Sequence, residues 1–185
     1  YDIDGGFSIM SELRTNRIIP RDGLPSGSVG GIIQIKSKHI TDYFTTNSGT
    51  YVDVTGHSIS ITPTRADSKI LIQYWINWYC NNGNDTAVTL RLLRNGTVIG
   101  SDSGNPMNDD RMGMITMYMS QQTHHSVSGF NYLDSPATTS ALTYKTQVHC
   151  DSTSFTGGNI WGVNRFPALD DYRGSSSITA YEVSG

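Results

Sequence analysis

The stretch KILIQYWINWYC, residues 69–80, carries the longest strand-type pattern in the chain. A repeat of two places alternate side chains on the same face of a strand. One face of this stretch is uniformly apolar or aromatic and consists of Ile70, Ile72, Tyr74, Ile76, Trp78 and Cys80. The other face mixes apolar and polar groups: Leu71, Gln73, Trp75, Asn77 and Tyr79. A strand with aromatic side chains on both faces is expected to be central in a sandwich or to be covered by another subunit.

Further short runs of strand type lie on both sides of this stretch, and no amphipathic pattern of helical period exceeds one turn. The runs before it cover residues 32–35, 51–54 and 58–62, and those after it cover 87–94, 97–100, 114–119, 128–133, 142–149, 159–163 and 177–183. Asn95-Gly96 separates two apolar runs, and both residues accept a positive φ, so this dipeptide predicts a hairpin. The pattern predicts an all-β chain, a single jelly-roll or β-sandwich domain of about ten strands.

The chain is expected to divide into an extended N-terminal leader, residues 1–28, and one domain, residues 29–185. Two prolines and two glycines between residues 20 and 27 exclude a helix in that part of the leader. Met10 opens a sequence that resembles a natural protein start. Residues 1–9 are then either a remnant of cloning or upstream coding sequence, and both alternatives stay open.

The leader is either a solvated linker or a strap that packs along a neighbouring subunit or plugs into a particle. Ile18, Ile19 and Leu24 favour the strap, because a solvated linker does not need apolar side chains.

Composition restricts the class of partner. The formal net charge is -3 and charged residues make up 16% of the chain, so no nucleic-acid partner is expected. No apolar run approaches the roughly 20 residues that a membrane-spanning helix needs, and we expect no membrane insertion. The N-terminus has no basic region followed by an apolar stretch, as a signal peptide would. Cys80 and Cys150 are predicted to be two buried thiols or, alternatively, a disulfide.

Motifs for catalysis and metal binding are missing from the sequence. It has no nucleophile elbow, no phosphate-binding glycine loop, no His-Glu-x-x-His and no calcium loop, so we expect no enzymatic activity, no cofactor and no metal. His124 and His125 are neighbours and would point to opposite faces of a strand, so these two and His149 are interpreted as exposed loop histidines. The acidic pairs 109–110 and 170–171 are interpreted as solvated turn residues.

Candidate binding residues lie in two turn-rich segments near the C-terminus and in one long polar loop. A flat aromatic ring can stack on a sugar while polar groups fix its orientation. The candidates in the late segments are Trp161, Arg165, Tyr172 and Arg173. Those in the loop, residues 102–111, are Asn105, Asn108 and Arg111. The alternative for Trp161 is a core position in a late strand.

Several motifs in their order and spacing resemble fibre-type structural proteins of marine and cyanobacterial phages. They are SITPT at 60–64, SKILI at 68–72, LRLLRNGT at 90–97, YLDSP at 132–136, YKTQ at 144–147 and SITAYEV at 177–183. The resemblance extends from about residue 30 to residue 183, and residues 10–34 also resemble the opening of such proteins.

The resemblance implies a jelly roll similar to the tumour necrosis factor-like head, which forms a homotrimer on a tail or capsid fibre at the virion surface. It implies contact with other virion proteins and with a host cell-surface glycan. Because family members vary most in their loops, it assigns no binding residue. Low charge and the second face of residues 69–80 also favour a permanent subunit interface.

Two other functions stay open. One is a capsid-decorating or connector protein without a ligand. The other is a depolymerase that cuts surface polysaccharide, which is weaker because phage depolymerases tend to be long β-helices and this chain has no matching repeat.

Overall fold

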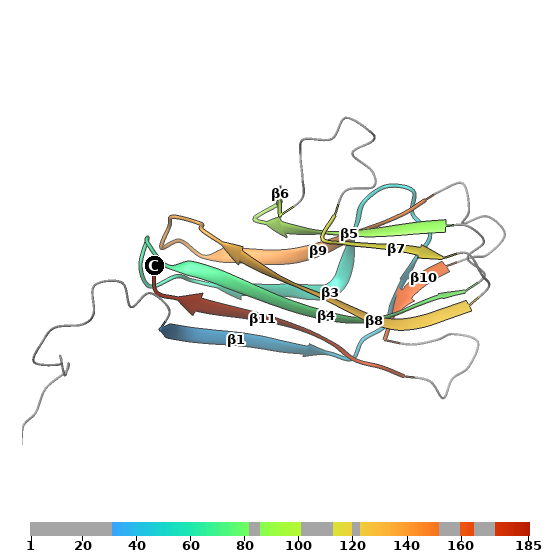
Figure 1. Ribbon diagram of the computed structural model, residues 1–185, viewed down its shortest axis with the longest axis horizontal. Coiled ribbons are helices and arrows are strands. Elements are labelled where there is room, and N and C mark those ends of the chain that lie inside the picture. Colours follow the sequence, from blue (N-terminus) through green and yellow to red (C-terminus); the bar gives the residue numbers. More distant parts are fainter. Residues whose placement is uncertain (1–30, 82–85, 101–112, 120–122, 152–159, 165–172) are drawn as a thin grey trace, which may run out of the picture.

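The computed structural model describes residues 31–81, 86–100, 113–119, 123–151, 160–164 and 173–185. The described residues contain strands and no helix, which confirms the all-β prediction (Figure 1). The strands are β1 (Ile32–Ile40), β2 (Phe44–Thr46), β3 (Val52–Ile61), β4 (Lys69–Asn81), β5 (Thr86–Arg94), β6 (Thr97–Ile99), β7 (Ile115–Met119), β8 (Thr123–Asp134), β9 (Leu142–Cys150), β10 (Ile160–Val163) and β11 (Ser176–Val183). The predicted leader, residues 1–28, lies outside the described residues.

The strands form two antiparallel sheets, called here sheet A and sheet B. In sheet A, β1 pairs with β11, and β4 pairs with β11 along one edge and with β8 along the other. On the same edge as β11, β10 pairs with the last residues of β4, 78–81, and β2 pairs with β10. In sheet B, β3 pairs with β9 and β9 with β5, while β6 and β7 pair with β5. In both sheets, long strands from early and late parts of the chain alternate. This is the connectivity of a jelly roll, with its two sheets facing each other.

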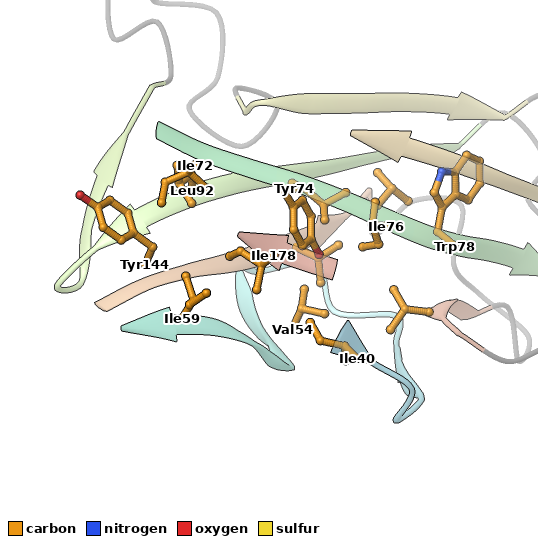
Figure 2. Packing of buried hydrophobic residues seen from close by; sticks show 14 of the residues in the cluster. Ile40, Val54, Ile59, Ile72, Tyr74, Ile76, Trp78, Leu92, Tyr144 and Ile178 are labelled. Carbon is orange, nitrogen blue, oxygen red and sulfur yellow. The ribbon is translucent and has the colours of Figure 1, made fainter. Parts of the chain in front are cut away.

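The buried face of β4 forms the centre of the core. Every even position from Ile70 to Cys80 is buried, as the alternation predicted. Figure 2 shows Ile72, Tyr74 and Ile76 along β4 within the cluster, which also includes residues of sheet B such as Leu92. Each apolar side chain of this size contributes about 1.5–3 kcal/mol when it is fully buried.

Two local features of sheet B follow from residues that accept a positive φ. Asn95 and Gly96 have φ values of 49° and 87°, which confirms the hairpin between β5 and β6. Gly56 has a φ of 83° and lies where the pairing of β3 with β9 shifts register, between Asp53 and Ser58. The two runs expected at 51–54 and 58–62 are therefore one strand, β3, with an irregularity in its pairing.

The structure corrects the position of the histidines. β8 pairs with the whole of β4, from Asp134 opposite Ile70 to Thr123 opposite Asn81, so it begins earlier than the apolar run at 128–133. His124 and His125 consequently lie in a strand rather than in a loop, although both are exposed as expected. His149 lies in β9 and is buried, and the loop interpretation is wrong for it too.

Candidate functional site

Most of the predicted binding residues lie outside the described part of the chain. These are Asn105, Asn108, Arg111, Arg165 and Tyr172, and the acidic pairs 109–110 and 170–171 lie outside it as well. The structure describes the remaining two candidates, Trp161 and Arg173.

Trp161 is a core residue. It lies in β10, opposite Cys80 of β4 and Thr46 of β2, and none of its surface is exposed. An indole in this position cannot stack on a sugar at the surface, so the structure agrees with the core alternative. Arg173 is exposed and precedes Gly174, whose backbone N–H donates to the carbonyl oxygen of Asn164 at 3.1 Å. The structure does not bring the two candidates together in one site.

The outer face of sheet A carries a row of large apolar side chains across four strands. The register places Ile35 opposite Tyr181, Tyr181 opposite Leu71, and Leu71 opposite Leu133. Ile35 and Leu133 are 53% and 49% exposed. The Tyr181 hydroxyl donates to Oε1 of Gln73 at 3.2 Å, which holds the ring on this face.

The same face continues to Trp75 and Val127, which are 49% and 57% exposed. Gly129 lies opposite Trp75, and a Cβ atom added to it would lie 2.7 Å from the indole ring. The indole therefore lies across the backbone of β8 at Gly129, with much of its surface open. We refer to Ile35, Leu71, Trp75, Val127, Leu133 and Tyr181 as the outer apolar face.

The outer face of sheet B carries a row of charged and polar side chains, and Tyr118, 68% exposed on β7, is a large apolar side chain on the same face. Asp53 accepts hydrogen bonds from Lys145 Nζ and Gln147 Nε2, both at 2.7 Å, and these bonds lower the pKa of Asp53. Arg91 donates from Nε and Nη2 to Oε1 of Gln147 at 2.9 and 2.7 Å. Its guanidinium carbon lies 3.6 Å from the centroid of the Tyr51 ring. We refer to Arg91, Gln147, Asp53 and Lys145 as the polar row.

Two buried carboxylates, Asp134 and Glu182, are held by hydrogen-bond partners within the chain. The Asp134 carboxylate accepts from Arg94 Nη1, at 2.8 Å to each oxygen, and from the Tyr144 hydroxyl at 2.6 Å. Burial, together with the hydrogen bond to Asp134, raises the pKa of Tyr144. These contacts link β5 and β9 of sheet B to β8 of sheet A.

Glu182 is a fully buried carboxylate at the end of β11. It accepts from Gln34 Nε2 at 2.6 Å and from the backbone N–H and hydroxyl of Thr64 at 2.7 and 2.8 Å. Burial alone would raise the pKa of Glu182. The hydrogen bonds outweigh burial and lower the pKa to about 2. The carboxylate fixes the segment between β3 and β4 against β1 and β11.

The two cysteines are buried thiols, which agrees with the first of the two alternatives. Burial raises the pKa of Cys150 to about 12, and Cys80 contributes to this shift. A thiol with such a pKa has little thiolate at neutral pH and is a poor nucleophile. In the part of the chain that the structure describes, no group of three or more metal-binding side chains occurs.

Two sets of surface residues were not singled out from the sequence. For the outer apolar face, the signal was the partly apolar second face of residues 69–80, but only the pairing register brings Ile35, Leu133 and Tyr181 to the same face. For Arg91, the sequence shows an arginine in a strand and gives no sign that Gln147 of β9 and Tyr51, which precedes β3, lie next to it.

No family model matches the chain, and no curated protein matches it. Among solved structures, it is similar to VP2 in the crystal structure of the infectious bursal disease virus VP2 subviral particle, with a TM-score of 0.38 and 13% sequence identity. The match covers 82% of this chain and 38% of that chain, so this chain spans less than half of that protein's length. At this TM-score the similarity carries no inference about function. Among the described residues, none forms a helix long and apolar enough to cross a membrane.

Proposed function

We propose that this domain is the head of a bacteriophage virion fibre, in which three copies associate through the outer face of sheet A. The proposed role is structural and adhesive rather than catalytic. The head would lie at the virion surface, attach to other virion proteins and contact a glycan on the host cell. The resemblance of the sequence motifs to phage fibre proteins and the jelly-roll connectivity both support this role.

The outer apolar face is the observation that carries the proposal. Large apolar side chains that are half exposed and adjacent across several strands are unusual on a soluble monomer. They are typical of the centre of a permanent interface between identical subunits. Further copies of the same chain can cover this face in a closed, symmetric assembly. The resemblance to phage fibre proteins favours three copies.

The polarity of the two sheets supports the choice of sheet A. The outer face of sheet B carries the polar row, whose members hydrogen-bond to one another without any help from a partner subunit. Covering this row would remove charged groups from water, which costs free energy. Covering the outer apolar face removes apolar surface from water instead and stabilises the assembly.

Light scattering on the purified protein tests the assembly. We expect a mass of three chains that does not fall on dilution to micromolar concentration, and a mass of one chain would contradict the proposal. Cryo-electron microscopy of intact virions tests the location. Density for the trimer at the tip of a fibre would support the adhesive role, whereas density within the capsid lattice would favour the decorating or connecting role.

A further inference from the structure

We propose that Arg91 forms a binding site for the carboxylate of an acidic sugar on the outer face of sheet B. The inference rests on the proposed function in that it names the class of glycan that the head would contact. It places this contact on the face of a sheet, and on the sheet that does not carry the outer apolar face.

The guanidinium of Arg91 has an open hydrogen-bonding edge. An arginine side chain has five N–H donors. In Arg91, Nε and Nη2 each direct one of them at Oε1 of Gln147. The terminal pair of nitrogens therefore keeps N–H groups that point away from this contact. Two such parallel donors match the two oxygens of a carboxylate.

The charge of Arg91 is not neutralised by the described neighbours. Its hydrogen-bond acceptor is the neutral amide of Gln147. Asp53, the carboxylate of the polar row, already accepts from Gln147 with one oxygen and from Lys145 with the other. The polar row thus contains two cations and one anion, and the unmatched cation is Arg91.

Two other arginines provide a contrast. Arg94 binds both carboxylate oxygens of Asp134 at 2.8 Å. Arg65 binds Asp67, from Nε to Oδ1 at 2.9 Å and from Nη2 to Oδ2 at 2.5 Å. Each has its own carboxylate within the chain, whereas the contacts of Arg91 are with a neutral amide and an aromatic ring.

The side chain of Arg91 is already ordered for binding. Its guanidinium lies 3.6 Å from the centroid of the Tyr51 ring, and that ring packs against His149 with centroids 5.3 Å apart. A cation over an aromatic ring is stabilised by the ring electrons. Because stacking and the Gln147 contact fix the side chain beforehand, a ligand loses less conformational entropy when it binds.

The surroundings favour a singly charged carboxylate on a sugar. One unmatched guanidinium balances one negative charge. Gln147, Asp53 and Lys145 lie beside it along the strands and offer polar groups to sugar hydroxyls. We therefore assign uronic-acid-type glycans as the ligand class rather than neutral ones.

Titration of the whole protein with short galacturonate oligomers, followed by NMR, tests this site. Neutral galactose oligomers and sulfated dextran are the comparison ligands. We expect the galacturonate oligomer to shift signals of Arg91 and Tyr51, and Arg91→Met to weaken binding on the order of tenfold or more. Arg91→Lys keeps the charge but loses the paired donors, so it should also weaken binding. The matched control is Arg65→Gln, which removes an arginine that already has a carboxylate partner and should bind like the parent.

Several results would overturn the assignment: no binding of the galacturonate oligomer, equal binding of the neutral oligomer, stronger binding of sulfated dextran, or equal losses in Arg65→Gln and Arg91→Met. Arg91→Lys keeps the test valid if Arg91→Met does not fold. The mass of the same sample separates this site from the proposed function. A trimer that binds no galacturonate contradicts only the site, whereas a monomer that binds it contradicts only the trimeric assembly.

Discussion

His57 is a buried histidine on β3 that links the two sheets. Its Nδ1 shares a hydrogen bond with the hydroxyl of Tyr74 on β4, at 2.5 Å, and that hydroxyl also accepts from Thr146 on β9 at 3.4 Å. Nε2 has no hydrogen-bond partner among the described residues. Burial, with a smaller effect from Lys38, lowers the pKa of His57 to about 4. The neutral ring is therefore the form that the core accepts.

We predict that His57 makes the fold sensitive to mild acid. The unfolded chain protonates this histidine below the ordinary histidine pKa of 6.5, whereas in the folded chain the ring stays neutral until the pH reaches about 4. Stability is complete above pH 6.5 and falls as the pH drops toward 4, by about 3 kcal/mol at 1.36 kcal/mol per pKa unit. Urea unfolding of the parent and of His57→Gln at pH 7.5 and pH 4.5 measures this. The decrease between the two pH values should be smaller in the variant, and an equal decrease would assign the acid sensitivity to other groups.

We also predict that Trp78→Ala destabilises the fold by about 3–5 kcal/mol, the usual cost of removing a large aromatic side chain from a core. Trp78 is 6% exposed, and its Nε1 donates to Ser128 Oγ at 2.9 Å. The denaturation midpoint in urea measures the loss. Tyr118→Ala is the control, because this ring is 68% exposed on β7. Similar midpoints for Trp78→Ala and the parent would show that the buried face of β4 is assigned incorrectly.

Individual residues also show where sequence analysis reaches its limit. Burial along β4 follows from alternation alone, because each inward position is apolar. Trp161 has the same signal in a much shorter run, so the sequence left both a surface role and a core role open. Arg91 could not be found at all, because its site depends on two neighbouring strands that lie far away in the chain.

At the scale of elements, strands with strong alternation or a clear turn were predicted closely. β4, β9, β11 and the β5–β6 hairpin agree with the expected ranges to within one or two residues. β2 was missed because three residues are too few to establish a pattern. The first half of β8 was missed because its residues are mostly polar, and it is a strand because β4 offers it a full-length partner.

The hairpin allows a test at this scale. Gly96 has a φ of 87°, and a Cβ atom added there would meet nothing within 4 Å. The cost of Gly96→Ala is therefore the strain of a left-handed backbone alone, about 1 kcal/mol. Chemical denaturation measures this loss of stability. Thr97→Ala, at the next residue, is the control, because it changes a side chain at the same end of the sheet without changing the glycine. A Gly96→Ala protein as stable as the parent would mean that the turn adopts another conformation in solution.

At the scale of the whole molecule, the outer apolar face lies on sheet A and the polar row lies on sheet B. The buried links between the sheets, at His57 with Tyr74 and at Arg94 with Asp134, hold the sandwich together without any help from a partner. Neither of these links involves the outer apolar face. The polar row on the opposite side stays open to a ligand in a trimer built through sheet A. Sheet A would then form the subunit interface, and sheet B would bind the glycan.

This division predicts that a charge on sheet A separates the subunits and that the same charge on sheet B does not. Leu133 is 49% exposed at the β8 end of the outer apolar face, opposite Leu71. Leu133→Glu would place a carboxylate in an interface without a partner, which costs several kcal/mol in each subunit, while a single chain would keep it in water. Light scattering should therefore give the mass of one chain, with the circular dichroism spectrum unchanged. Thr116→Glu, at an exposed position of β7 in sheet B, should give the mass of three chains. If Leu133→Glu remains a trimer and Thr116→Glu dissociates, the subunits associate through sheet B, and the polar row rather than the outer apolar face is then buried in the assembly.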